Sequence, residues 1–205
     1  MITYFANPTN AGRQAMLDGL LGYIDTPAQG NRRPAGDVLW CADNGAFSDR
    51  FDPQLWWAWL ERNAFDAKQC VFAVAPDVVG DAAATLTRSA PWLSRIRGLG
   101  FPVAYVAQDG LPESSVPWDD IDALFIGGST EFKLGPVAAD AVADAKSRGK
   151  WVHMGRVNSR KRLRYAASIG CDSADGTYLV FAPEKNLSNM LRWLDEINSQ
   201  PLVAA

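Results

Sequence analysis

The sequence contains a single histidine, His153, and this scarcity excludes several kinds of active site. A zinc site with two histidine ligands and an H-E-x-x-H metalloprotease helix each need a second histidine. A serine–histidine–aspartate triad would have to use His153, and no G-x-S-x-G motif accompanies it. Because His153 falls in a predicted buried strand, we expect a hydrogen-bonded core histidine rather than a catalyst.

Cysteine and long apolar runs are also scarce. Cys41, Cys70 and Cys171 are far apart, odd in number and form no C-x-x-C pair, so we expect reduced, buried thiols in a cytoplasmic protein. No apolar run approaches the roughly 18 residues of a membrane-spanning helix. The first residues lack the basic region and long apolar core of a signal peptide. The sequence therefore predicts no membrane partner.

An excess of positive charge is missing as well, since 20 Lys and Arg face 23 Asp and Glu for a net charge of −3. Bulk electrostatics would not draw the protein onto nucleic acid, so binding would need a local patch. One stretch offers such a patch: Arg156, Arg160, Lys161, Arg162 and Arg164. These cations crowd the start of a predicted helix, where the dipole already favours an anion such as phosphate. Lys133 is a further candidate contact, and the alternative is a solvated basic helix face.

The 205 residues, 48% hydrophobic and 21% charged, show no break in composition and predict one domain spanning 1–205. Short apolar segments alternate with amphipathic ones, as in parallel βα units. Strands are expected at 2–6, 38–42, 71–75, 103–107, 123–126, 151–154 and 171–174, with 178–181 as an eighth candidate. Helices are expected at about 11–23, from Pro53, and at about 81–97, 136–148 and 187–197.

Polar or glycine residues follow nearly every predicted strand. They are Asp43, Asp77, Gln108, Gly127 with Gly128, Gly155 and Asp175. In a (β/α)8 barrel these positions converge on one mouth, where such enzymes keep their catalytic groups. In a doubly wound sheet they would spread along an edge. We therefore predict an α/β protein with a compact, TIM-like (β/α)8 barrel, and keep the doubly wound sheet as the alternative.

Each of these residues also has a purely structural interpretation. Asp77 or Asp81 could cap the next helix, and Asp175 could cap or form a turn. Gln108 begins a Q-D-G turn, and the Gly127–Gly128 pair could be a turn or bind phosphate through its N–H groups. Met154 could simply fill the core.

Six short motifs occur in order: D-N-G-A-F at 43–47, P-D-V-V-G-D at 76–81, V-A-Q-D-G at 106–110, F-I-G-G-S-T at 125–130, H-M-G-R-V at 153–157 and D-S-A-D-G at 172–176. This ordered set resembles the tRNA-guanine transglycosylase superfamily. It looks closest to the small deazapurine DNA modification branch (DpdA-type transglycosylases) of phages and bacterial gene clusters. Each motif alone is weak, and six in sequence are more specific.

The resemblance implies a role for each matching residue. Asp175 would be the nucleophile and Asp172 the preceding strand aspartate, while Asp43 would assist proton transfer. Phe47 and Met154, the latter in an M-G turn with Gly155, would stack on the base from its two sides. The base edge would be read by the following residues: Asp77, Gln108, Gly127 and Gly128. The motif D-N-G-A-F departs from the family's D-S-G-G-F, because Ala46 places a side chain where the family usually has glycine.

The implied activity is exchange of guanine in DNA for a 7-deazaguanine, such as 7-cyano-7-deazaguanine, through a covalent aspartyl-sugar intermediate. The family's tRNA enzymes carry a three-cysteine, one-histidine zinc site, which this sequence lacks, so DNA is favoured over tRNA and no metal or cofactor is expected. The partners would be guanine-containing duplex DNA and the free deazaguanine, with a homo-oligomer or accessory protein as options, in the host cytoplasm if the gene is phage-encoded. Alternatives are a tRNA-type transglycosylase, a base-releasing nucleoside hydrolase, and a non-catalytic barrel that binds purine or phosphate.

Overall fold

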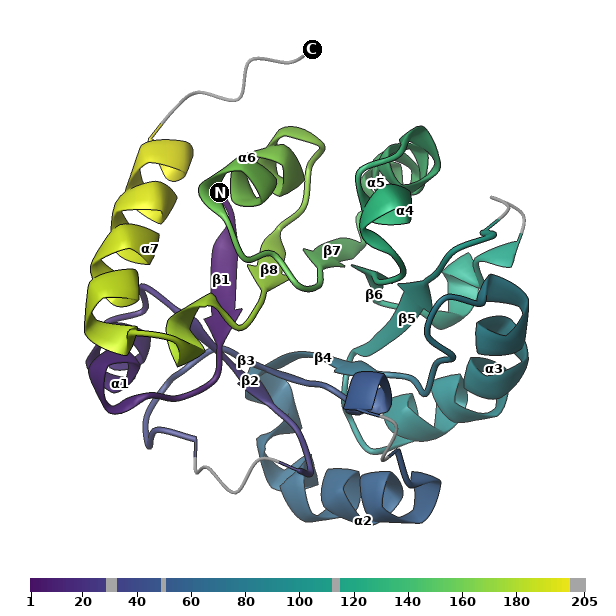
Figure 1. Ribbon diagram of the computed structural model, residues 1–205. Helices are drawn as coiled ribbons and strands as arrows, with labels where there is room; N and C mark the ends of the chain where they lie inside the picture. Colours follow the sequence, from purple (N-terminus) through teal and green to yellow (C-terminus); the bar gives the residue numbers. More distant parts are fainter. Residues whose placement is uncertain (29–32, 49–50, 112–114, 200–205) are drawn as a thin grey trace.

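Eight parallel strands pair in chain order and close into a barrel, with β8 hydrogen-bonded to β1 (Figure 1). The computed structural model describes residues 1–28, 33–48, 51–111 and 115–199. Within these residues the strands are β1 (Thr3–Ala6), β2 (Gly22–Asp25), β3 (Trp40–Ala42), β4 (Cys70–Val74), β5 (Val103–Ala107), β6 (Ala123–Ile126), β7 (Trp151–Met154) and β8 (Ser173–Asp175). The predicted (β/α)8 barrel is confirmed, and the doubly wound sheet is excluded because the sheet has no edge.

Helices surround the barrel (Figure 1). They are α1 (Asn10–Leu17), α2 (Pro53–Asn63), α3 (Ala82–Gly98), α4 (Thr130–Lys133), α5 (Pro136–Ser147), α6 (Arg160–Ser168) and α7 (Pro183–Asn198), with 3-10 turns η1 (Ala46–Ser48), η2 (Ala64–Gln69), η4 (Trp118–Asp120) and η5 (Tyr178–Val180). Side-chain caps start several of them: Asp81 accepts from Ala84 N at α3 and Ser159 accepts from Arg162 N at α6. None of the helices in the described ranges is long and apolar enough to cross a membrane.

Two predicted elements are wrong. The helix expected at 11–23 ends at Leu17, and residues 22–25 form β2 instead. The apolar positions Leu20 and Tyr23 continue the helical spacing of α1, which hides a turn at Gly19 with a φ of 73°. The strand needs glycine at its first position, because a Cβ on Gly22 would lie 2.5 Å from the Phe5 ring.

The expected eighth strand at 178–181 is the other error. Residues Tyr178–Val180 form the 3-10 turn η5, and the barrel is already closed by the pairing of Thr3 with Ser173 and of Phe5 with Asp175. With both edges paired, no position in the sheet is left for another strand. The true eighth strand, β8, extends through Asp175, one residue beyond its expected end.

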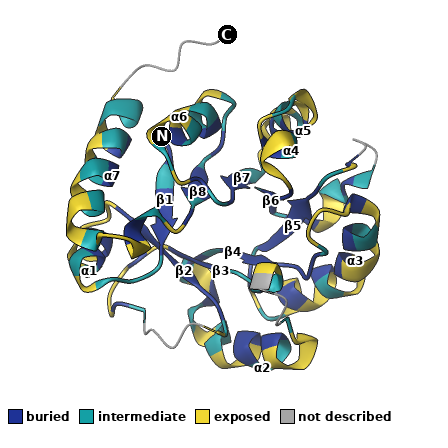
Figure 2. Cartoon of the chain, viewed as in Figure 1, coloured by how far each residue is buried: buried dark blue, intermediate teal, exposed yellow. Residues whose placement is uncertain are grey.

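The strands separate two apolar cores, and most of their residues are buried (Figure 2). One core lies between the barrel and the helices and includes Trp40 of β3 and Trp56 and Trp59 of α2. The other fills the barrel and includes Phe5, Phe72 and Val106. Because successive side chains on a strand point to opposite faces, every second residue belongs to the inner core.

This alternation also supplies the mouth of the barrel. The side chain two residues after an inner-core residue also points into the barrel, and it lies at the carboxyl end of the strand. The pairs of core residue and mouth residue are Phe5 and Asn7, Ile24 and Thr26, Cys41 and Asp43, Val106 and Gln108, Phe125 and Gly127, and Ser173 and Asp175. The fold therefore gathers one polar or small residue from each of these strands at a single opening.

Removing one inner-core ring should be costly. We expect Phe72→Ala to lower the free energy of unfolding by about 3–5 kcal/mol, because the ring is fully buried and packs on the Phe5 and Phe125 rings. Phe65→Ala is the matched control, since that ring is 86% exposed, and it should change stability by less than about 0.5 kcal/mol. Urea unfolding of both variants measures the difference; equal effects would contradict the assignment of Phe72 to a packed interior.

Candidate functional site

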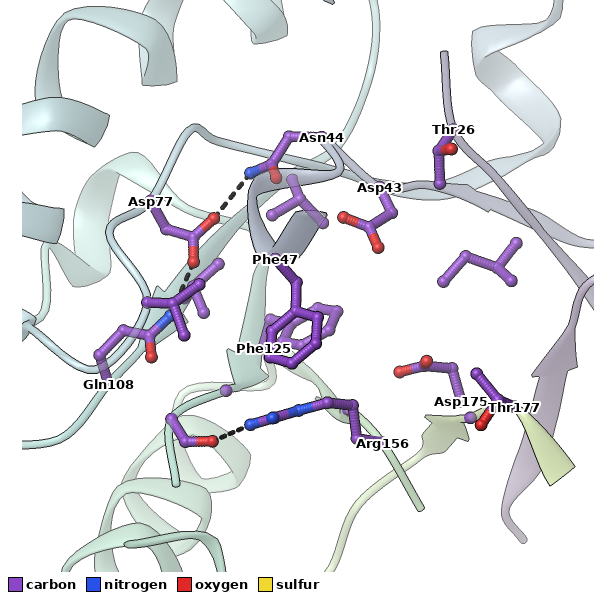
Figure 3. A pocket seen from close by; sticks show the side chains of 18 of the residues that line it. Thr26, Asp43, Asn44, Phe47, Asp77, Gln108, Phe125, Arg156, Asp175 and Thr177 are labelled. Atoms are coloured by element: carbon purple, nitrogen blue, oxygen red, sulfur yellow. Dashed lines mark hydrogen bonds between the residues drawn. The ribbon is translucent and has the colours of Figure 1, made fainter. Parts of the chain in front are cut away.

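A cavity of about 440 Å³ opens at the carboxyl end of the barrel (Figure 3). Its floor is apolar and formed by Ile24, Val74, Val106 and Phe125. Its walls include nine of the expected site residues: Asp43, Phe47, Asp77, Gln108, Gly127, Gly128, Gly155, Arg156 and Asp175. The predicted convergence of the strand ends is thus confirmed, although convergence alone assigns no chemistry.

Asp43 and Asp175 enter the cavity from β3 and β8, and both carboxyl groups point toward its middle in Figure 3. The Asp43 carboxylate accepts a hydrogen bond from Gly45 N at 3.0 Å. Burial raises the pKa of Asp43 to about 7, and the nearby negative charges of Asp175 and Asp77 act in the same direction. A carboxyl group that titrates near neutral pH can both give and take a proton there.

Asp77 forms the centre of a buried polar network. Its two carboxylate oxygens accept from Asn44 Nδ2 at 2.9 Å and from Gln108 Nε2 at 2.6 Å (Figure 3). Asp81, not Asp77, caps α3, so the capping interpretation of Asp77 is wrong. Burial raises the pKa of Asp77, while the hydrogen bonds from Asn44 and Gln108 act in the opposite direction.

Both ends of the Gln108 carboxamide already have partners within the protein. Its oxygen accepts from Gly80 N at 3.0 Å, and its nitrogen donates to Asp77. These two hydrogen bonds orient the carboxamide of Gln108, a residue that is only 1% exposed. They leave one hydrogen of its amide group for a ligand. A Cβ on Gly127 would lie 3.1 Å from that nitrogen and 2.7 Å from Val106, so glycine keeps this wall open.

Gly128 permits the next turn at the mouth. Its φ of 70° is unfavourable for other residues, and a Cβ there would come within 2.6 Å of the Asp109 carboxylate. That carboxylate accepts from Ser129 N at 2.7 Å and from Ser129 Oγ at 2.5 Å. Asp109 therefore ties the β5 loop to the β6 loop, which the Q-D-G sequence alone does not reveal.

Asp175 contacts the one histidine of the chain. His153 Nε2 lies 2.9 Å from Asp175 Oδ1, with His153 fully buried and the Asp175 side chain 16% exposed. Gly155 leaves no room for a side chain beside this pair, because a Cβ there would lie 2.7 Å from the Phe125 ring. His153 is hydrogen-bonded in the core as expected, but its partner is the candidate nucleophile, which sequence reasoning missed.

Arg156 connects three loops at the rim. It has a left-handed backbone, with φ of 59°, a strained conformation that non-glycine residues adopt rarely and often near functional sites. Its guanidinium donates to the Gly128 carbonyl and lies over Phe47, 4.5 Å from the ring centroid (Figure 3). Arg156 covers one face of the Phe47 ring. The rest of the Phe47 side chain is open to solvent, since the residue is 64% exposed.

Of the expected site residues that do not line the cavity, Met154 and Lys133 are buried elsewhere. Met154 is 1% exposed and packs in the core between barrel and helices, so its expected stacking on a base is wrong and its structural interpretation is correct. The cause is strand alternation, since His153 points inward and its neighbour must point outward. Lys133 is 4% exposed and donates to the Gly155 carbonyl at 2.8 Å, so it is not placed to contact a nucleic-acid backbone. Burial lowers the pKa of Lys133 to about 8.

The remaining cations lie at the start of α6, which follows the mouth directly. Lys161 and Arg164 are exposed, and Arg162 is partly buried. Arg160 forms an ion pair with Glu196 of α7, 2.6 Å apart, so part of the basic stretch is already neutralised. The helix dipole and these side chains still place positive charge beside the cavity.

Several cavity residues carried no role in the sequence analysis: Asn7, Thr26, Asn44, Phe125, Asn158, Gly176 and Thr177. Asn44 and Phe125 lie inside quoted motifs, so the signal was present but unassigned. The three cysteines are free and buried, as predicted. Among the residues that the structure describes, no cluster of His, Cys, Asp or Glu could hold a metal ion.

No protein-family model matches the chain, and no curated protein matches it in sequence. Among solved structures it is similar to tryptophan synthase from Pyrococcus furiosus, at TM-score 0.62 and 12% identity over 97% of this chain and 98% of that chain. It is also similar to a native KDPGal structure, with a TM-score of 0.58 and 14% identity over 97% of this chain and 96% of that chain. A third similar structure is tryptophan synthase from M. tuberculosis, with a TM-score of 0.57 and 11% identity over 96% of this chain and 90% of that chain. At such identities the likeness shows the (β/α)8 barrel fold alone, and the resemblance to transglycosylases stays a prediction.

The raised pKa of Asp43 predicts a pH dependence of stability. An unfolded aspartate titrates near about 3.9. Since the folded pKa is higher, at about 7, the folded state binds the proton more tightly, and this stabilisation is complete below about pH 4 and lost as pH rises through about 7. Relative to Asp43→Asn, the wild type should therefore lose unfolding free energy between pH 4 and pH 7.5.

Urea titrations of both proteins across this range measure the effect. Asp120→Asn, at an exposed position, is the control for removing one negative charge. If the unfolding free energies of the wild type and Asp43→Asn differ by the same amount at every pH, the burial of this carboxyl group is contradicted.

Proposed function

We propose that this protein is a DNA guanine transglycosylase that exchanges guanine for a 7-deazaguanine, such as 7-cyano-7-deazaguanine. The observation that carries the proposal is the pair of carboxyl groups, Asp43 and Asp175, in one cavity with the polar edge of Asp77 and Gln108. The choice of this reaction over others comes from the ordered motifs in the sequence.

Asp175 is the nucleophile in this proposal. Its carboxylate attacks C1′ of the target nucleotide, the bond from C1′ to N9 of guanine breaks, and a covalent sugar–aspartate ester forms. The incoming deazaguanine then attacks C1′ through its own N9 and the ester bond breaks. Two displacements retain the configuration at C1′, as in retaining glycosidases.

Asp43 carries the proton in both steps. It donates to N9 of the departing guanine and accepts the N9 proton of the incoming deazaguanine, so it returns to its starting state. Its pKa of about 7 supports this, because the protonated and ionised forms are then both populated near neutral pH.

The base would lie between the apolar floor and the polar wall. Asp77 and the remaining amide hydrogen of Gln108 face its hydrogen-bonding edge, together with backbone groups at Gly127 and Gly128. Adenine would leave these buried groups unpaired, which is a strong basis for rejection. Phe47 offers stacking on the face of its ring that Arg156 leaves open.

A base in a duplex must leave the helical stack to reach this cavity. Arg156 at the rim and the exposed Lys161 and Arg164 of α6 would hold the flanking phosphates. DNA, rather than tRNA, is the polymer that the sequence resemblance favours, and a cytoplasmic enzyme without a cofactor is part of the same proposal.

The test is base exchange in isotopically labelled duplex DNA supplied with 7-cyano-7-deazaguanine. Digestion and mass spectrometry of the nucleosides should detect the deazaguanine deoxynucleoside with the wild type. Asp175→Ala should lower the rate by about 10³-fold or more, the scale of losing a nucleophile. Asp120→Ala, an exposed aspartate, is the matched control and should keep the wild-type rate.

Other outcomes identify the alternatives. Release of guanine without incorporation would indicate a base-releasing hydrolase, and exchange only in a tRNA pool would indicate the tRNA-type reaction. Tight binding of guanine with no turnover, unchanged in Asp175→Ala, would contradict the proposal in favour of a binding barrel.

A further inference from the structure

A buried line of hydrogen bonds leads from the far part of the barrel interior to Asp175. Trp151 Nε1 donates to Ser173 Oγ at 2.8 Å, and Ser173 Oγ lies 2.8 Å from His153 Nδ1. His153 Nε2 lies 2.9 Å from Asp175 Oδ1. All four residues come from the neighbouring strands β7 and β8, at alternate positions that point into the barrel.

The order of donors in this line fixes the state of the imidazole. The Trp151 indole can only donate, so Ser173 Oγ must accept from it. Ser173 is fully buried, and His153 Nδ1 is the partner left for its hydroxyl hydrogen among the described residues. Nδ1 is then an acceptor without a hydrogen, and the ring is neutral with its proton on Nε2. A doubly protonated ring would leave the buried Ser173 hydroxyl hydrogen without an acceptor.

With this tautomer, His153 donates its Nε2 hydrogen to Asp175 Oδ1. The bond orients the carboxylate and occupies Oδ1, while Oδ2 has no hydrogen-bond partner among the described residues. The side chain is partly exposed to the cavity, so Oδ2 is the oxygen that can meet a sugar carbon.

We propose that His153 is a positioning residue that orients Asp175 for nucleophilic attack through Oδ2, and that Trp151 and Ser173 set its tautomer. The inference rests on the proposed function in taking Asp175 as the reacting group. Packing supports it, since the imidazole lies among three phenylalanine rings, with centroids 5.9 Å away for Phe5, 5.2 Å for Phe72 and 4.6 Å for Phe125. These rings prevent the imidazole from turning away from the carboxylate.

An ordinary core histidine would satisfy its nitrogens without regard to the cavity. Here the imidazole contributes an N–H to a carboxyl group that lines the site, at the cost of burying polar atoms inside an aromatic core. A structural role predicts effects on stability alone, and a positioning role predicts a fall in kcat with little change in KM. The two roles can therefore be separated.

The first experiment uses the fact that the chain has one histidine. Protein labelled with ¹⁵N-histidine gives the nitrogen signals of one ring, and at neutral pH they should show a proton on Nε2 and none on Nδ1. Ser173→Ala removes the donor to Nδ1 and should let Nδ1 take up a proton more readily, while the Asp175 carboxylate still accepts from Nε2. A wild-type ring with its proton on Nδ1, or on both nitrogens, would overturn the proposal whatever the activity of the protein.

The second experiment compares three variants in the exchange assay. His153→Phe keeps an aromatic ring among the three phenylalanines but removes the donor, and should lower kcat by about 10- to 100-fold, the scale known for losing a hydrogen-bond partner that orients a metal-ligating side chain. The KM for the deazaguanine should stay within about two-fold, because His153 is not among the residues that line the cavity. His153→Gln can still donate an N–H and should recover part of kcat, and Ser173→Ala should fall between His153→Phe and the wild type.

Thermal unfolding separates folding from positioning. His153→Phe with the kcat of the wild type would overturn the proposal, as would variants whose losses follow melting temperature alone. Failure of the wild type to exchange any base would instead contradict the proposed function, and the nitrogen signals would still decide whether the hydrogen-bond line exists.

Discussion

The pairing of β8 with β1 is the constraint on which the site depends. Thr3 lies opposite Ser173 and Phe5 opposite Asp175, and this register closes the barrel. Closure forces the inward positions of all strands to share one interior, so apolar side chains fill the middle and polar ones emerge together at the carboxyl ends. A slip of one residue in β8 would turn Asp175 toward the helices and Ala174 toward the cavity.

Burial then sets the chemistry of the groups that closure collects. The carboxylate of Asp77 accepts from the neutral amides of Asn44 and Gln108, Arg88 donates to the Asp77 backbone carbonyl, and burial raises the pKa of Asp77. Burial also raises the pKa of Asp43, to about 7. The guanidinium of Arg156 stays at the rim, bound to the Gly128 carbonyl and stacked on Phe47. The cavity thus has two carboxyl groups of raised pKa at its walls and a guanidinium at its entrance.

Much of the fold and part of the site follow from the sequence. Alternating apolar segments with polar or glycine residues after them predicted the barrel and seven of the residues around the cavity, because period-2 burial is visible in a sequence. Phe47 was predicted from the resemblance and Arg156 from the cluster of positive charge. β2 was hidden because Leu20 and Tyr23 keep a helical spacing across Gly19. Met154 and Lys133 were misassigned because a motif gives no side-chain direction, and the roles of His153 and Asn44 depend on contacts between strands.

The central claim is that the Asp175 carboxylate forms a covalent bond to the sugar. The most direct measurement mixes the protein with guanine-containing duplex DNA, denatures the mixture and locates any adduct by peptide mass spectrometry. The account predicts a sugar-linked adduct on the peptide that contains Asp175, formed more slowly in Asp43→Asn, which lacks the proton donor to guanine N9, and lost in Asp175→Ala. An adduct on another residue, or one that persists in Asp175→Ala, would contradict it.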